Sequence, residues 1–246
     1  MNLSLIELLD PVEFALRRLH FTPDETQARI LRSNSTQGLL NCARQWGKST
    51  ITAIKALHTA LSNPRQLILV ASPTERQSAE FIRKCRDFLL PLPLKLRGDG
   101  ANRSSLLLPN HSRIVGLPGR EATIRGFSNV ALLLIDEAAQ APDSLYLALR
   151  PMLAMSRGSL WLLSTPKGAR GFFWEEWTRG DGWERIAIPA WDCPRYDPAF
   201  LDRERASMPG RWFQQEYGCA FMDDDAQVFS LALLESVACD EPPLIG

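Results

Sequence analysis

Short, mostly apolar runs recur along the first two thirds of the chain. They occupy residues 38–43, 66–71, 130–135 and 159–164. Runs of this length that do not alternate with polar residues are typical of strands buried on both faces, as in parallel sheets. Residues 48–61 and 75–89 have the apolar spacing of amphipathic helices instead. This alternation of buried strands with helices predicts a doubly wound α/β fold with a mostly parallel sheet.

The remaining patterns predict smaller elements. Residues 104–117 contain two strand-like stretches around a Pro-Asn-His turn, which favours a peripheral antiparallel hairpin. The aromatic residues of 171–177 recur at helical spacing, which favours packing in the core over stacking on bases. Residues 183–190 predict one more strand, and residues 197–217 predict two helices separated by a Pro-Gly pair.

The stretch Ala43-Arg44-Gln45-Trp46-Gly47-Lys48-Ser49-Thr50 joins the first predicted strand to the first predicted helix. Gly-Lys-Ser at a strand-to-helix turn is the core of a phosphate-binding loop. Backbone N–H groups and the helix N-terminus face the anion there, and the lysine adds a point charge. The hydroxyl of Ser49 follows where it can ligate Mg²⁺. The general pattern has a glycine five residues before Gly47, where Cys42 stands, so this loop alone leaves a chance match open.

Two acidic residues, Asp136 and Glu137, come directly after the run at 130–135. The carboxyl ends of parallel strands are where open α/β sheets bind ligands. We expect Asp136 to hold Mg²⁺ through water and Glu137 to orient and deprotonate the attacking water. The alternative is a solvated acidic pair that begins a loop. The presence of Lys48 earlier in the chain favours the catalytic interpretation.

Small hydroxyl residues, Ser164 and Thr165, follow the run at 159–164. At a strand tip they can contact the γ-phosphate of a nucleotide or the water that attacks it, and so act as a sensor. Ser, Thr and Pro also end strands for purely local reasons. The sensor assignment therefore depends on the order of the three motifs along the chain.

Composition narrows the class of protein. A chain of 246 residues is long enough for one large α/β domain. The formal net charge is zero, so the whole chain lacks a basic signature of nucleic-acid binding, although basic residues outnumber acidic ones over residues 76–125. Five scattered cysteines without Cys-x-x-Cys spacing argue against a zinc site and fit a reducing cytosol. We expect no membrane span, because no apolar run approaches ~20 residues.

Taken in order, these motifs resemble the large terminase subunit of tailed bacteriophages, the motor that packages DNA into the procapsid. The resemblance covers nearly the whole chain, and the missing early glycine is normal in that family. It rests on Pro23, Gln27, the Arg-Gln-x-Gly-Lys-Ser loop at 44–49, Ile124-Arg125-Gly126, Leu134-Ile135-Asp136-Glu137-Ala138-Ala139, Ser164-Thr165-Pro166-Lys167-Gly168, Phe213-Gln214-Gln215-Glu216-Tyr217 and Val228-Phe229.

The resemblance implies a P-loop NTPase fold of the RecA/ASCE type. Such a fold has a mostly parallel sheet flanked by helices and a small helical lid. The implied ATPase domain covers residues 1–229, with the lid drawn from 1–36 and 183–229. Residues 230–246 would then be a linker or tail. The family's second domain is a nuclease of the ribonuclease H type, for which the remaining residues are too few, so we expect no nuclease activity from this chain.

The resemblance also assigns roles to single residues. Gln27 would contact adenine, because a carboxamide both donates and accepts hydrogen bonds; the alternative is an ordinary surface glutamine of a helix. Arg44 would reach the phosphates of the chain's own ATP. Arg125 would be supplied to the ATP of a neighbouring subunit; the alternatives are a surface salt bridge, or this role for the nearby Arg120. The expected ATP-binding residues are Gln27, Arg44, Gln45, Gly47, Lys48, Ser49 and Thr50, and the expected Mg²⁺ ligands are Ser49 and Asp136.

The implied activity is Mg²⁺-dependent ATP hydrolysis that powers translocation of double-stranded DNA. The implied partners are double-stranded DNA, further copies of the chain in a ring (a pentamer), the portal protein and the small terminase subunit, all in the host cytoplasm. Two alternatives remain open. One is a helicase-like DNA-dependent ATPase, although the chain is too short for the second RecA-like domain that a helicase needs. The other is a nucleotide-binding assembly module with negligible turnover.

Overall fold

A computed structural model describes residues 3–94, 104–118 and 126–222 of the chain. The helices and strands are, in chain order, α1 (Leu5–Leu9), α2 (Pro11–Arg18), α3 (Glu25–Arg32), β1 (Gln37–Cys42), α4 (Lys48–Ser62), β2 (Leu67–Ser72), α5 (Glu75–Leu89), β3 (Ser105–Leu107), β4 (Arg113–Pro118), β5 (Val130–Asp136), η2 (Ala138–Gln140), α6 (Asp143–Leu149), η3 (Arg150–Leu153), β6 (Ser159–Ser164), α7 (Gly171–Thr178), β7 (Glu184–Ile188), η4 (Ala190–Asp192), α8 (Pro198–Ser207) and α9 (Gly210–Tyr217).

The strands form one sheet in the order β3-β4-β2-β5-β6-β1-β7. All neighbouring pairs are parallel except β3 and β4, which form the expected antiparallel hairpin at the edge of the sheet. The registers place Asn41 beside Ser164, and Asp136 beside Leu163. The carboxyl ends of β1, β5 and β6 therefore meet at one edge of the sheet. The predicted α/β class with a mostly parallel sheet is confirmed.

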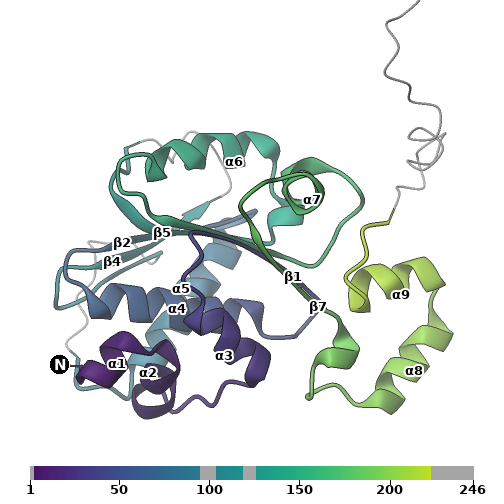
Figure 1. The fold of residues 1–246 in the computed structure, drawn as a ribbon, viewed down its shortest axis with the longest axis horizontal. Coiled ribbons are helices and arrows are strands. Elements are labelled where there is room, and N and C mark those ends of the chain that lie inside the picture. The colour runs from purple at the N-terminus through teal and green to yellow at the C-terminus, as the bar shows by residue number, and fades with distance from the viewer. Residues whose placement is uncertain (1–2, 95–103, 119–125, 223–246) are drawn as a thin grey trace, which may run out of the picture.

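Helices cover both faces of the sheet (Figure 1). α4 and α5 lie against one face with α1–α3 packed outside them, and α6 and α7 lie against the other face. Successive strand residues point to opposite faces, so Leu134 packs into the core beneath α4 while Leu133 and Ile135 pack beneath α6 and α7. Two buried apolar layers thus hold the central strands, as the unbroken apolar runs predicted.

The lid expected from residues 1–36 and 183–229 divides into unlike parts. The helices α1–α3 share the main core with α4, and β7 pairs with β1 in the sheet. α8 and α9 lie to one side of β7 in Figure 1, where Leu201 and Cys219 belong to a small cluster of their own. Within the described residues, α8 and α9 are thus the helices that stand apart from the sheet. The division of the chain at residue 229 falls outside the described residues and stays a prediction.

No helix within the described part of the chain is both long and apolar enough to cross a membrane.

Candidate active site

The loop between β1 and α4 adopts left-handed backbone conformations at two positions. Gly47 has φ 102° and immediately precedes α4, and Gln45 has φ 56°. A Cβ atom at Gly47 would lie no closer than 3.6 Å to another side chain, so the glycine is required by its backbone conformation and not by space. The first N–H groups of α4 have no carbonyl partner within the helix, which leaves them available to an anion.

Two side-chain contacts join this loop to the end of β5. Ser49 Oγ donates a hydrogen bond to Asp136 Oδ2 at 2.9 Å. Lys48 Nζ lies 3.0 Å from Glu137 Oε1 in an ion pair. Residues from positions 48–49 and 136–137 therefore meet at the carboxyl edge of the sheet, as their places after two parallel strands predicted.

Burial and neighbouring charges set the ionisation of this group. Burial raises the pKa of Asp136, and the ammonium of Lys48 opposes that shift. For Lys48, burial acts to lower the pKa, but the carboxylates of Glu137 and Asp136 outweigh it and raise the pKa above its usual value. Lys48 is therefore a cation at neutral pH, enclosed beside two carboxyl groups.

Glu137 is held in an unusual conformation. Its φ is 53° and its ψ is 44°, in the left-handed region that a glutamate seldom adopts. Its backbone N–H donates to Asp136 Oδ1 at 3.0 Å, and Gln140 Nε2 donates to its Oε2 at 3.2 Å. Strain of this kind is commonly found where a side chain must be aimed at a reacting group.

The hydroxyls after β6 differ in their partners. Ser164 Oγ accepts from the backbone N–H of Ala139 at 3.1 Å and donates to Thr165 O at 2.7 Å, so it fixes the turn that follows Glu137. Thr165 Oγ1 is buried, and no atom of the described residues forms a hydrogen bond with it. Ser164 thus orients the backbone, while the hydroxyl of Thr165 is buried without a partner among the described residues.

A cleft of about 550 Å³ opens over these residues. The phosphate loop, the start of α5, η2 and the segment after β6 form its inner walls, and Trp212, Gln215 and Glu216 of α9 form its outer wall. Gln215 Oε1 accepts from the N–H of Gly168 at 3.1 Å, which ties α9 to the segment after β6. A helix about fifty residues downstream of β6 therefore completes the cleft.

Arg44 lies at the mouth of this cleft and is bound to α9. Its Nε forms an ion pair with Glu216, and its Nη2 lies 3.3 Å from Glu216 Oε1. The hydroxyl of Tyr196 donates to the carbonyl of Arg44. The guanidinium expected to reach the phosphates is thus paired with a carboxylate here and would have to exchange partners.

Two further expected ATP-binding residues already have protein partners. Gln27 is buried as the third residue of α3, where its Oε1 accepts from the N–H of Asp24 in a capping box. Its amide nitrogen is the atom nearest a Cβ added at Gly47, so the carboxamide does lie against the phosphate loop. The hydroxyl of Thr50 accepts from Lys84 Nζ at 3.2 Å.

Sequence reasoning missed several residues around the site. Glu216 and Arg195 contact the loop from more than 140 positions away, and neither stands in a motif with a phosphate-binding mechanism. Gln140 could have been found, because it lies three residues after Glu137 and so within reach on a tight helical turn. Arg125 and Arg120 lie outside the described residues.

The donors at the Ser49–Asp136 contact suit Mg²⁺. This ion prefers oxygen ligands and is usually held by one or two protein groups together with water and substrate phosphates. A hydroxyl and a buried carboxylate within hydrogen-bonding distance of each other match that pattern. No cluster of three or more His, Cys, Asp or Glu side chains suited to a metal occurs among the described residues.

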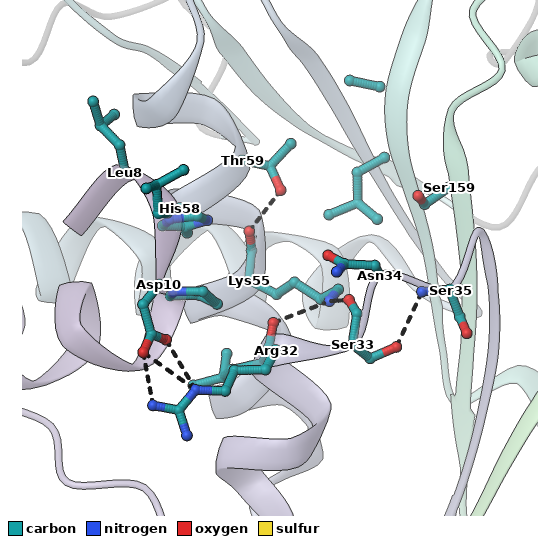
Figure 2. A pocket seen from close by; sticks show the side chains of 15 residues that line it. Leu8, Asp10, Arg32, Ser33, Asn34, Ser35, Lys55, His58, Thr59 and Ser159 are labelled. Carbon is teal, nitrogen blue, oxygen red and sulfur yellow. Dashed lines mark hydrogen bonds and ion pairs between the residues drawn. The ribbon is translucent and has the colours of Figure 1, made fainter. Parts of the chain in front are cut away.

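A second cavity, of about 560 Å³, lies at the amino ends of β5 and β6, away from the cleft (Figure 2). Several of its polar groups bind one another. Lys55 Nζ donates to the carbonyls of Ser33, Ile30 and Leu31 at 2.9, 3.2 and 3.4 Å, and Arg32 pairs with Asp10 at 2.7 Å. The Lys55 contacts fix the C-terminal end of α3 on α4, and the Arg32–Asp10 pair fixes it on the start of α2. We therefore interpret this cavity as structural.

Comparisons with known proteins agree on one family. The family described as "Terminase large subunit, T4likevirus-type, N-terminal" matches residues 39–236. A terminase large subunit of Thermus phage G20c is 25% identical over 263 aligned positions, which cover 90% of this chain and 53% of that protein. This chain thus spans about half the length of the curated relatives it matches.

Solved structures show the same fold. A mutant of the large terminase ATPase domain of Thermus phage P74-26 has a TM-score of 0.74 at 22% identity, over 87% of this chain and all of that one. The large terminase of the HK97 bacteriophage has a TM-score of 0.66 at 15% identity, over 85% of this chain and 53% of that one.

Proposed function

Because the chain belongs to the family of phage terminase large subunits, matching its N-terminal region over residues 39–236, we propose that it is the Mg²⁺-dependent ATPase motor domain of a DNA-packaging machine. Hydrolysis would power translocation of double-stranded DNA into the procapsid, with the chain acting in a ring of copies beside the portal protein and the small subunit. The proposed domain covers residues 1–229, with 230–246 as a linker or tail. Nuclease activity forms no part of the proposal.

The observation that carries this proposal is the meeting of four side chains at the carboxyl edge of the sheet. Lys48 and Ser49 begin α4. Lys48 contacts Glu137, which follows β5, and Ser49 contacts Asp136, the last residue of β5. A cation at a helix N-terminus, beside an oxygen pair suited to Mg²⁺ and a strained glutamate, matches what phosphoryl transfer to water needs.

Each of these residues has a distinct proposed role. Lys48 binds the β- and γ-phosphates and releases Glu137 from their ion pair. Glu137 then orients a water molecule and accepts its proton. Ser49 and Asp136 would hold Mg²⁺, which neutralises phosphate charge when bound. Thr165, with its unengaged hydroxyl, faces the γ-phosphate, and Ser164 keeps the turn after Glu137 in place.

Hydrolysis by the purified chain tests this proposal. We expect ATP turnover that depends on Mg²⁺ and rises when double-stranded DNA is added, and we expect Lys48→Ala to abolish both nucleotide binding and turnover. Arg203→Ala, which removes a cation from α8, is the matched control and should retain both. Binding of ATP without turnover, in the assembled motor as well as in the single chain with DNA, would instead favour the assembly module. Failure to bind nucleotide would refute both functions.

A further inference from the structure

Arg195 spans two parts of the proposed nucleotide site. It lies in the connection between η4 and α8, and its side chain is about half exposed at 47%. One guanidinium nitrogen donates to Asp24 Oδ2 at 2.7 Å, and the other donates to the carbonyl of Trp46 at 2.6 Å. A single planar group therefore binds both the start of α3 and the phosphate loop.

The contact with Trp46 sets the direction of a loop N–H group. In a planar trans peptide the carbonyl and the following N–H point to opposite sides. Holding the Trp46 carbonyl toward Arg195 therefore directs the N–H of Gly47 away from Arg195. Tyr196 also orients a loop N–H group. Its hydroxyl donates to the carbonyl of Arg44, which directs the N–H of Gln45 away from Tyr196. Backbone N–H groups that point to one side of a loop form an anion-binding nest.

The contact with Asp24 sets the position of Gln27. Asp24 Oδ1 accepts from the N–H of Gln27 at 2.8 Å, while its other oxygen binds Arg195. The amide nitrogen of Gln27 would lie 3.6 Å from a Cβ atom built at Gly47, so it lies against the loop. Arg195 thus fixes the distance between the residue expected to contact the base and the loop expected to hold the phosphates.

We propose that Arg195 is a positioning residue that sets the phosphate loop and the start of α3 in register for a nucleoside polyphosphate. This inference rests on the proposed function, and it adds a residue from the segment leading into α8 to the nucleotide site. Its hydrogen bond to Trp46 orients the loop that binds the phosphates, and its hydrogen bond to Asp24 positions Gln27, which binds the base. The effects of these two hydrogen bonds can be distinguished by comparing the affinity for a ligand that has a base with the affinity for one that lacks it.

The test is calorimetric titration of the full chain with Mg²⁺-ADP and with Mg²⁺-pyrophosphate. We expect Arg195→Ala to weaken both ligands by roughly tenfold or more, the effect of losing a charge-assisted hydrogen bond. Asp24→Asn keeps the helix-capping oxygen but loses the charge that holds Arg195. It should weaken ADP while leaving pyrophosphate within about twofold of the wild type. Arg195→Lys should fall between the alanine variant and the wild type.

Arg29→Ala is the matched control. It removes an arginine from the last turn of α3, the helix that Asp24 caps, and it should leave both affinities unchanged. Wild-type affinities in Arg195→Ala, or equal weakening of both ligands in Asp24→Asn, would overturn the inference. If Arg195→Ala does not fold, Asp24→Asn and Arg195→Lys decide the matter. Absence of ADP binding by the wild-type chain would refute the proposed function, and this inference with it.

Discussion

At the scale of single residues, the proposed chemistry depends on Glu137. Its carboxylate pairs with Lys48 in this structure. The phosphates of a bound nucleotide must therefore replace Glu137 as the partner of Lys48 before the glutamate can act on water. The left-handed backbone at Glu137 and the hydrogen bond from Gln140 hold its side chain at the edge of the cleft. The residue is thus positioned before any ligand arrives.

We predict that Glu137→Gln retains nucleotide binding and loses hydrolysis by roughly 10²–10⁴-fold, because an amide cannot accept the proton of the attacking water. Turnover measured at saturating ATP, together with ADP affinity, checks this. Glu75→Gln, at the exposed start of α5, serves as the control and should retain turnover. Wild-type hydrolysis in Glu137→Gln would show that another group is the base.

A second residue-scale prediction concerns Gly38 in β1. A Cβ atom there would lie 2.4 Å from the ring of Trp161, which is fully buried on the adjacent strand. Gly38→Ala must therefore displace a large core side chain, and we expect it to lower the free energy of unfolding by about 1–3 kcal/mol.

Gly210→Ala is the matched control, because nothing lies within 4 Å of a Cβ at that position. Chemical denaturation should show the loss for Gly38→Ala and no loss for Gly210→Ala. Equal stabilities for Gly38→Ala and the wild type would mean that Trp161 does not pack over β1 as described.

At the scale of elements, an ion pair with a buried carboxylate joins the first two helices. Glu7 of α1 accepts from Arg18 of α2 at 2.6 and 2.9 Å, and from the N–H and hydroxyl of Ser4 at 2.7 and 2.8 Å. The Arg18 guanidinium lowers the pKa of Glu7 from an ordinary value of 4.5 to about 2. Sequence patterns could not show this pairing, because it joins two short helices across a turn.

A carboxyl group with a lowered pKa stabilises the fold only while it is ionised. The contribution of Glu7 is therefore complete above about pH 4.5 and is lost as the pH falls toward 2. We predict that Glu7→Gln lowers stability at neutral pH and flattens the decline between these values. Glu13→Gln, on the exposed side of α2 beside Arg17, should keep the wild-type profile. Parallel acid-unfolding curves for Glu7→Gln and the wild type would contradict this account.

The elements that sequence predicted best are those whose signal is local. The buried runs gave β1, β2, β5 and β6 within one or two residues, because a strand covered on both faces must be apolar throughout. The amphipathic spacing of residues 75–89 predicted α5 with the bounds that it has, Glu75–Leu89. The carboxyl-edge position of Lys48 and Asp136 then followed from parallel topology.

What sequence could not predict are contacts between distant segments. Arg44 was expected to face phosphates, but it pairs with Glu216, whose position beside the loop follows only from the path of α9. Gln27 was expected to present its amide to adenine, yet one side of that amide completes a helix cap. Each residue has two competing partners, and only the fold decides which of them is within reach.

At the scale of the whole molecule, the proposed motor needs more than one copy of the chain. Arg125 lies outside the described residues, so its role in a neighbour's site rests on the family resemblance alone. We predict that Arg125→Ala leaves ADP affinity of the single chain unchanged and removes hydrolysis in the assembled motor. An arginine supplied in this way is worth on the order of 10³–10⁵ in rate in other NTPases.

Mixing experiments distinguish action on a neighbour from action within one chain. Arg125→Ala and Glu137→Gln subunits combined in one assembly should recover part of the activity, because each supplies what the other lacks across an interface. Mixtures of Arg125→Ala with Lys48→Ala subunits serve as a second pair and should also recover part of the activity. No recovery in either mixture would place Arg125 within its own site or exclude it from the reaction.

The central claim is that nucleotide phosphates bind where β1 leads into α4. A structure of the chain with Mg²⁺ and a non-hydrolysable ATP analogue tests this most directly. We predict the phosphates against the N–H groups at the start of α4, with Lys48 moved from Glu137 to the β- and γ-phosphates, and Mg²⁺ beside Ser49 and Asp136. An analogue bound elsewhere, or a Lys48–Glu137 pair that persists with the phosphates in place, would contradict the account.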